Sequence, residues 1–338
     1  MPPLTFLHAT RYSLSAKPSH ILCGMVLLAN LGAWVWAVCT LGASPLLLGA
    51  AGLDWAFGLR HGLDADHIVA IDTVTRKLML SGRPPLRVGL FFSLGHSSVV
   101  LLATAVLFIL PLQGWLERWH LIGGVLGTSV SGIFMGLTVI ANGWMALQQW
   151  RAFQNKEHAG AALGPASLTG WLLRPFFKLI GRAWHMYPLG FVFGLGFDTA
   201  SEIGLLGMTT LQAAHGLGPL GVLSLPLLFT AGMALVDTLD TVLMCHVYGW
   251  YGQTQKRHAV YNLAITLFSL VAATGVGAVE VCPLILENTT SDFFSKSVDF
   301  ASEHFSAIGA GILIVFSLLW ALAQLLQYFS KKRQKNLK

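Results

Sequence analysis

Histidine and carboxylate side chains are crowded into one short stretch of this chain. Residues 60–72 read RHGLDADHIVAID and hold six ionisable side chains, among them the imidazoles of His61 and His67. Neutral imidazole binds first-row transition metals well, whereas sodium, magnesium and calcium prefer ligand sets made of oxygen alone. The residue types therefore indicate chemistry with a divalent transition-metal ion.

The composition shows what kind of protein surrounds this stretch. Hydrophobic residues make up 54% of the 338 residues, charged residues make up 11%, and the mean hydropathy is +0.65. These values are typical of an integral membrane protein and exclude an ordinary soluble domain. The net charge of +6 then reports membrane orientation and not nucleic-acid binding. The four cysteines lack the paired spacing of a disulfide framework or a thiolate metal site.

Apolar runs of about 20 residues, each long enough to cross a membrane as a helix, recur along the chain. They predict an all-α integral membrane protein with about eight transmembrane helices, at residues 20–42, 47–72, 87–110, 121–146, 184–211, 217–247, 258–282 and 303–329. Lys and Arg gather in alternate connections, which places both termini in the cytoplasm. The connection after the second span is predicted to hold Arg76, Lys77, Arg83 and Arg87.

The same charge pattern suggests how the chain is organised. We divide it into a first four-helix half, a cytoplasmic connecting loop, a second four-helix half and a basic cytoplasmic tail, at residues 1–146, 147–183, 184–330 and 331–338. The loop contains Gly164-Pro165 and Arg174-Pro175, which interrupt regular structure.

Further ionisable residues lie inside the predicted third, fifth and sixth spans: His96, Asp198, Glu202, Asp237 and Asp240. Each costs at least ~3 kcal/mol near the bilayer centre unless it faces a partner, water or a cation. We therefore expect these groups and residues 60–72 to converge on one interior site. Because the carboxylates outnumber the basic Arg60, either several are protonated or a cation completes the site. The other spans carry almost no such residues and are expected to form the outer wall.

The spacing within the second span limits how its residues can cooperate. On a regular helix His61 and His67 lie about 120° apart and roughly 9 Å apart along the axis, too far to share one small ion. Gly62 permits a local break, as in transporters whose helices are interrupted at the substrate site. Alternatively, part of the motif binds metal and the rest supports it by hydrogen bonds. Asp54 and Asp72, near the ends of this span, either face water or belong to the interior.

Four motifs in order resemble the nickel/cobalt permease family (NiCoT). They are RHGLDADHIVAIDTVTR from residue 60, FFSLGHSSVV at 91–100, LGFDTASEIGLL at 195–206 and GMALVDTLDTVLM at 232–244. The resemblance covers both halves of the chain. It implies an eight-span secondary permease that imports Ni²⁺ and/or Co²⁺ across the cytoplasmic (inner) membrane. It further implies that His61, Asp66 and His67 are required. Thr241 and Ser201 depart from the family pattern, which commonly has Gly and Thr there.

The predicted metal site consists of His61, Asp64, Asp66, His67, His96, Asp198, Glu202, Asp237 and Asp240. The ion is the transported substrate, and no cofactor and no nucleic-acid partner are expected; the expected partners are nickel or cobalt ions and the lipid bilayer. Some alternatives stay open. Asp64 is either a support for the ligands or a partner of Arg60, and His96 is either a ligand or a helix-interface histidine. The carboxylates of the fifth and sixth spans form either a metal path or a proton path.

Competing functions are an intramembrane metalloenzyme, a metal exporter and a proton-coupled permease for another cation. The sequence contains no H-E-x-x-H motif, which argues against the zinc enzyme. The predicted middle loop holds His158 as its single histidine, unlike the His-rich loop of related exporters. The chain is therefore predicted to be a metal permease and not an enzyme.

Overall fold

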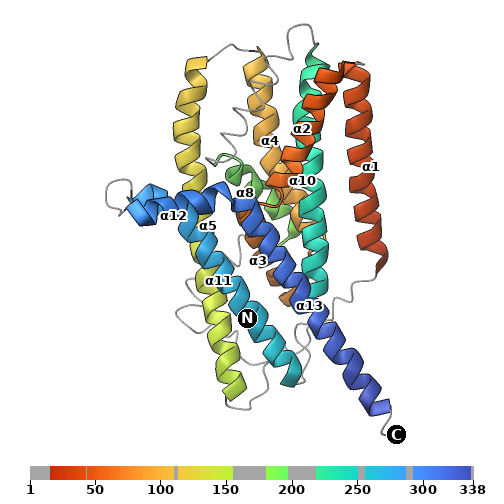
Figure 1. Ribbon diagram of the computed structural model, residues 1–338, viewed down its shortest axis with the longest axis vertical. Helices are drawn as coiled ribbons and strands as arrows, with labels where there is room; N and C mark the ends of the chain where they lie inside the picture. Colours follow the sequence, from red (N-terminus) through yellow and green to blue (C-terminus); the bar gives the residue numbers. More distant parts are fainter. Residues whose placement is uncertain are drawn as a thin grey trace, which may run out of the picture.

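The computed structural model describes residues 16–42, 44–109, 113–154, 180–196, 218–249, 256–286 and 292–335, and within these ranges all regular structure is helical. The helices run mostly along the long axis of the molecule, with α12 lying across the others (Figure 1). Their bounds are α1 Ala16–Leu41, α2 Pro45–His61, α3 Ala65–Leu80, α4 Val88–Ile109, α5 Gln113–Gln154, η1 Ala183–His185, α8 Met186–Phe193, α10 Pro219–Tyr248, α11 Lys256–Leu286, α12 Asp292–Glu303 and α13 Phe305–Lys335.

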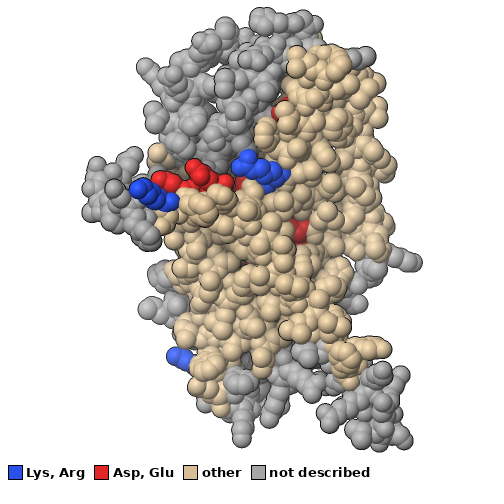
Figure 2. Space-filling model, in the orientation of Figure 1, with Lys and Arg blue, Asp and Glu red and all other residues tan. Residues whose placement is uncertain are grey.

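Six helices of the described ranges are long and apolar enough to cross a membrane. These spans are Pro18–Leu41, Val88–Val106, Val125–Arg151, Pro219–Tyr248, Val260–Cys282 and Phe305–Leu325. The surface agrees with this assignment, because most of the described atoms on the face in Figure 2 belong to uncharged residues, and the charged ones gather mainly in one band. The prediction of an all-α integral membrane protein is therefore confirmed.

The helices match the predicted spans except at two places. The second span is not one helix, because α2 ends at His61 and α3 begins at Ala65. The fifth span begins with η1 and α8, and its remainder, residues 197–211, lies outside the described residues. The count of eight spans and the position of the termini stay predictions. The predicted division of the chain into two halves, a loop and a tail also remains a prediction, although α5 extends to Gln154, inside the predicted connecting loop.

Two helices form the centre of the molecule. Helix α10 packs against α1, α2, α3, α4 and α13, and α3 contacts α4, α5, α10, α11 and α13. Figure 1 shows α10 running along the molecule beside α1 and α2. Helix α3 is enclosed so completely that thirteen of its sixteen residues are buried. Helix α3 extends to Leu80, so it includes Arg76 and Lys77, and both side chains are buried. The prediction that these two residues lie in a connection was wrong.

Glycines let α10 approach its neighbours to backbone contact. A Cβ atom added to Gly58 of α2 would lie 2.1 Å from the carbonyl oxygen of Phe229, and one on Gly232 would lie 2.5 Å from the α2 backbone. Helix α4 approaches in the same way, because a Cβ on its Gly89 would lie 1.9 Å from the carbonyl oxygen of Asp237. Small residues of this kind are typical of close helix packing in membranes. They fix α2 and α4 directly against α10.

Candidate metal site

The break between α2 and α3 brings two histidines together. Gly62, after the last residue of α2, keeps helical dihedral angles, whereas Asp64 is extended, with φ −62° and ψ 143°. Two tight bonds close the turn: Leu63 N donates to Arg60 O at 2.9 Å and Asp64 N donates to His61 O at 2.9 Å. Across this turn the ring centroids of His61 and His67 are 4.8 Å apart. A regular helix would separate the same residues by roughly 9 Å along its axis.

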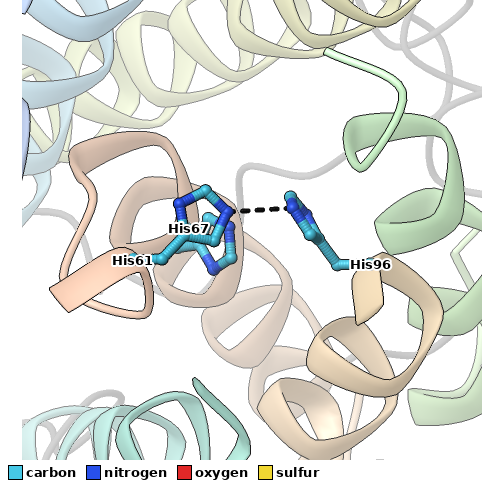
Figure 3. Close-up of side chains that lie close together, drawn as sticks. All are labelled: His61, His67 and His96. Carbon is cyan, nitrogen blue, oxygen red and sulfur yellow. Dashed lines mark hydrogen bonds between the residues drawn. The ribbon is translucent and has the colours of Figure 1, made fainter. Parts of the chain in front are cut away.

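Three histidines from three helices form the centre of the site. His61 ends α2, His67 lies in the first turn of α3, and His96 lies on α4, where Figure 3 shows its ring facing the other two. One ring nitrogen of each lies within 4.8 Å of the others, and the Nε2 atoms of His61 and His96 are 2.9 Å apart. All three side chains are buried, with at most 2% of the residue surface exposed. The convergence that the sequence predicts for these three residues is present in the structure.

Two of the three imidazole rings have a carboxylate beside their Nδ1 atom. Asp64 Oδ2 lies 2.7 Å from His61 Nδ1, and Asp237 Oδ1 lies 3.3 Å from His67 Nδ1. A carboxylate at Nδ1 holds the proton there and leaves Nε2 with a free lone pair. In agreement, His67 Nε2 is buried and has no hydrogen-bond partner within the described part of the chain. Such a pair is the usual arrangement for a metal-binding histidine.

Aromatic rings close the sides of this cluster. Phe92 of α4 makes an edge contact with the His67 ring at 4.8 Å between centroids, and Phe229 of α10 lies 5.7 Å from the His61 ring. Both phenylalanines are fully buried. Apolar walls lower the local dielectric constant, so a charge inside them interacts strongly with the groups that face it. The candidate site thus combines three imidazole rings, two carboxylates and an apolar wall.

Helix α13 also contacts the break, a contribution that the sequence does not predict. The Ser306 hydroxyl donates a hydrogen bond to Asp64 Oδ1, and Arg60 Nε donates to Ser306 Oγ at 3.3 Å. A Cβ on Gly309 would lie 1.9 Å from the carbonyl oxygen of Leu63. The eighth span is therefore not simply outer wall. Small residues such as Ser306 and Gly309 let helix backbones approach closely in membranes.

The remaining predicted site residues lie outside the three-histidine group. Asp66 is next to His67 in the first turn of α3, and its Oδ1 is buried without a hydrogen-bond partner among the described residues. Asp240 is one turn beyond Asp237 on α10, 2% exposed, and neither of its carboxyl oxygens has a hydrogen-bond partner in the described ranges. The predicted residues Asp198 and Glu202 lie outside the described residues.

A second polar group joins α3 to α5, α10 and α11 further along α3. Tyr248 donates a hydrogen bond to Asp72, and Arg76 donates one to Asn142 and lies over the Tyr248 ring at 5.6 Å. Asp72 is 2% exposed and Asp54 is 1% exposed, so both belong to the interior. Neither Asn142 nor Tyr248 was predicted, because a single amide or phenol in an apolar span is common and carries no spacing signal.

The helical fold, the apolar surface and the buried histidine cluster define a multi-pass membrane protein with a candidate ion site in its interior. Comparison with known proteins identifies the family. Residues 47–326 match the family described as high-affinity nickel-transport protein, and the chain belongs to it. This family consists of transporters, so the chain is a transport protein and the alternative of an intramembrane metalloenzyme is excluded.

Several curated proteins are similar over most of their length. A high-affinity nickel transport protein of Cupriavidus necator is 40% identical over 314 residues, 90% of each chain. A nickel transporter of Staphylococcus aureus is 38% identical over 300 residues, covering 86% of this chain and 88% of that protein. A cobalt transport protein of Rhodococcus rhodochrous is 35% identical over 304 residues, 85% of each chain. No solved structure is significantly similar to this chain. The resemblance to nickel/cobalt permeases is thereby confirmed.

Proposed function

We propose that the protein is a secondary permease that imports Ni²⁺ and/or Co²⁺ across the cytoplasmic membrane. The observation that carries the proposal is the convergence of His61, His67 and His96 in a buried cluster within a membrane domain. The relatives named nickel and cobalt transporters support the same substrates.

In this proposal the three imidazoles replace part of the hydration shell of the ion. Nitrogen ligands favour nickel and cobalt over magnesium and calcium, which are held by oxygen. Asp64 and Asp237, behind His61 and His67, would balance the two positive charges of the ion as they orient the rings. This balance matters because an uncompensated charge inside apolar walls is unfavourable.

The other predicted carboxylates receive a different role in the proposal. Asp66 and Asp240 have buried oxygens without hydrogen-bond partners in the part of the chain that is described, so each can accept a cation that leaves the histidines. We assign them to the path of the ion, together with Asp198 and Glu202 of the fifth-span motif. Export of the metal and proton-coupled transport of another cation are the competing functions.

Uptake of labelled nickel by cells that lack their own nickel transporter tests the proposal. At nanomolar nickel we expect saturable uptake that excess cobalt inhibits and excess magnesium does not. The substitution His67→Ala removes one of three ligands and should reduce uptake more than the loss of a supporting residue would, by at least about 10-fold. His246→Ala is the matched control, because His246 is on α10 but exposed and bonded to the Val242 carbonyl.

The outcomes separate the function from the site. Absence of uptake by the wild-type protein, at confirmed membrane expression, would overturn import. Uptake by His67→Ala equal to that of the wild type and of His246→Ala, at matched protein levels, would overturn the assignment of the site.

A further inference from the structure

Asp64 stands at a position where an aspartate normally caps a helix, but it does not cap this one. It is the residue before α3 and has the extended backbone of an N-cap, yet its side chain makes no capping hydrogen bond. A capping aspartate usually accepts a bond from a backbone N–H of the first turn, which stabilises the helix by about 1 kcal/mol. The Asp64 carboxylate is therefore held away from the local partners that it would otherwise prefer.

Two side chains hold the Asp64 carboxylate, one at each of its oxygens. Oδ2 faces His61 Nδ1 at 2.7 Å, and Oδ1 accepts the hydrogen bond from the Ser306 hydroxyl. Each carboxylate oxygen thus has its own partner. Asp64 is 7% exposed, so little water is present to replace either one.

The Ser306 hydroxyl has a defined direction. A hydroxyl has one proton to donate and lone pairs that accept. Arg60 Nε donates to the Ser306 oxygen at 3.3 Å, so the proton of Ser306 remains for Asp64. Helix α13 contacts α3 at this point, and Gly309, one turn after Ser306, brings the two backbones together. The close contact between α13 and the start of α3 therefore fixes the position of the Ser306 hydroxyl.

We propose that Ser306 is a positioning residue for the transported ion, because it fixes the Asp64 carboxylate and through it the His61 imidazole. Without the hydroxyl, Asp64 is free to rotate to the N–H groups at the start of α3. His61 Nδ1 then loses the carboxylate that faces it at 2.7 Å, and the ring loses the orientation that presents Nε2 to the ion. This inference rests on the proposed function and adds to it a residue from the eighth span.

Kinetics of nickel uptake test this role. Loss of a residue that orients a metal ligand typically weakens metal binding by about 10- to 100-fold. We expect Ser306→Ala to raise KM for nickel about 10-fold while the maximal rate per transporter stays within about 2-fold. Ser306→Thr retains a hydroxyl and should keep KM within about 3-fold of the wild type. Ser317→Ala is the control on the same helix, because the Ser317 hydroxyl bonds only the Leu313 carbonyl in the described structure.

A double-mutant cycle distinguishes a positioning role from a general structural one. If Ser306 acts through Asp64, then Ser306→Ala added to Asp64→Asn should change KM by less than about 2-fold, because residues of one network are not additive. An unchanged KM in Ser306→Ala, or a further 10-fold increase in the Asp64→Asn background, would overturn the inference.

Nickel binding to the purified wild type and the same variants separates this inference from the proposed function. Binding without transport by the wild type would overturn import, and the dissociation constants of the variants would still decide the role of Ser306. A wild-type protein that neither transports nor binds nickel would overturn both.

Discussion

The contact between α13 and the α2–α3 break gives the sharpest test of how the site is held. Gly309 is one turn after Ser306 on α13. A Cβ atom at Gly309 would lie 1.9 Å from the carbonyl oxygen of Leu63 and 3.0 Å from the backbone nitrogen of Ala65. Both neighbours are backbone atoms of the break, so no flexible side chain can move aside. We therefore predict that Gly309→Ala displaces either α13 or the break itself.

The displacement can be worked out from these distances. Ordinary contacts of a Cβ atom begin at 3.4 Å, so α13 and the break must separate by about 1.5 Å at the contact that would otherwise be 1.9 Å. Overpacking of this kind typically costs about 1–3 kcal/mol. Metal sites, however, tolerate deviations of only about 0.2 Å in ligand distance. A moving break carries the His61 ring with it, because His61 directly precedes the break, and a moving α13 takes Ser306 away from Asp64. A misplacement of about 1 Å commonly costs about 100-fold in rate, and we expect a loss of nickel uptake of this order.

The assay is nickel uptake normalised to the amount of protein in the membrane, with the thermal midpoint of the purified protein measured in parallel. Gly311→Ala is the matched control, since nothing lies within 4 Å of a Cβ at this position two residues further along the same helix. Alanine is the better helix former by about 1 kcal/mol, so this variant should transport normally and be at least as stable as the wild type. Wild-type uptake by Gly309→Ala at equal expression would refute the reasoning that α13 holds the break in place.

Two further predictions concern α10. Asp237→Asn keeps the shape of the side chain but removes the charge 3.3 Å from His67 Nδ1, so nickel affinity should fall about 10-fold; unchanged binding by the purified variant would exclude Asp237 as an orienting group. Thr241 Oγ1 accepts a bond from the backbone nitrogen of Gly89 at 2.8 Å, a donor in the first turn of α4 that has no partner inside its own helix. Thr241→Val leaves this donor unsatisfied at a cost of about 1–3 kcal/mol and should lower the thermal midpoint by several degrees. Thr241→Ser should not, and equal midpoints for the Val and Ser variants would contradict this account.

Much of the fold can be predicted from the sequence, because hydropathy dominates the structure of a membrane helix. The predicted first, third, fourth, sixth, seventh and eighth spans overlap α1, α4, α5, α10, α11 and α13. The histidines of the site can be selected by residue type and by the unfavourable energy of polar groups in lipid. The break at Gly62 was one of two interpretations that the spacing left open, and the structure has it.

The partners of the histidines could not be predicted from the sequence, since they depend on contacts between distant segments. Asp237 is 170 residues from His67, and Ser306 is 242 residues from Asp64. A serine in an apolar helix is common and usually bonds its own backbone, as Ser317 does. Arg76 was placed in a connection because basic residues usually mark the end of a span. Arg76 is 1% exposed, because α3 begins after the break and places Arg76 in the interior among the neighbouring helices.

The glycine contacts of α10 also determine which parts of the molecule can move. Where Gly58 and Gly89 bring α2 and α4 against α10, the helices touch through backbone atoms, and no layer of side chains lies between them to repack. Sliding by a fraction of a turn would drive carbonyl oxygens into neighbouring backbone at these glycines, so we expect the three helices to move together. Alternating access requires bistable interfaces, in which side chains can exchange one packing for another. If the proposed transport proceeds by alternating access, we expect such exchange at interfaces other than those of α10 with α2 and α4, the helices that carry His61 and His96.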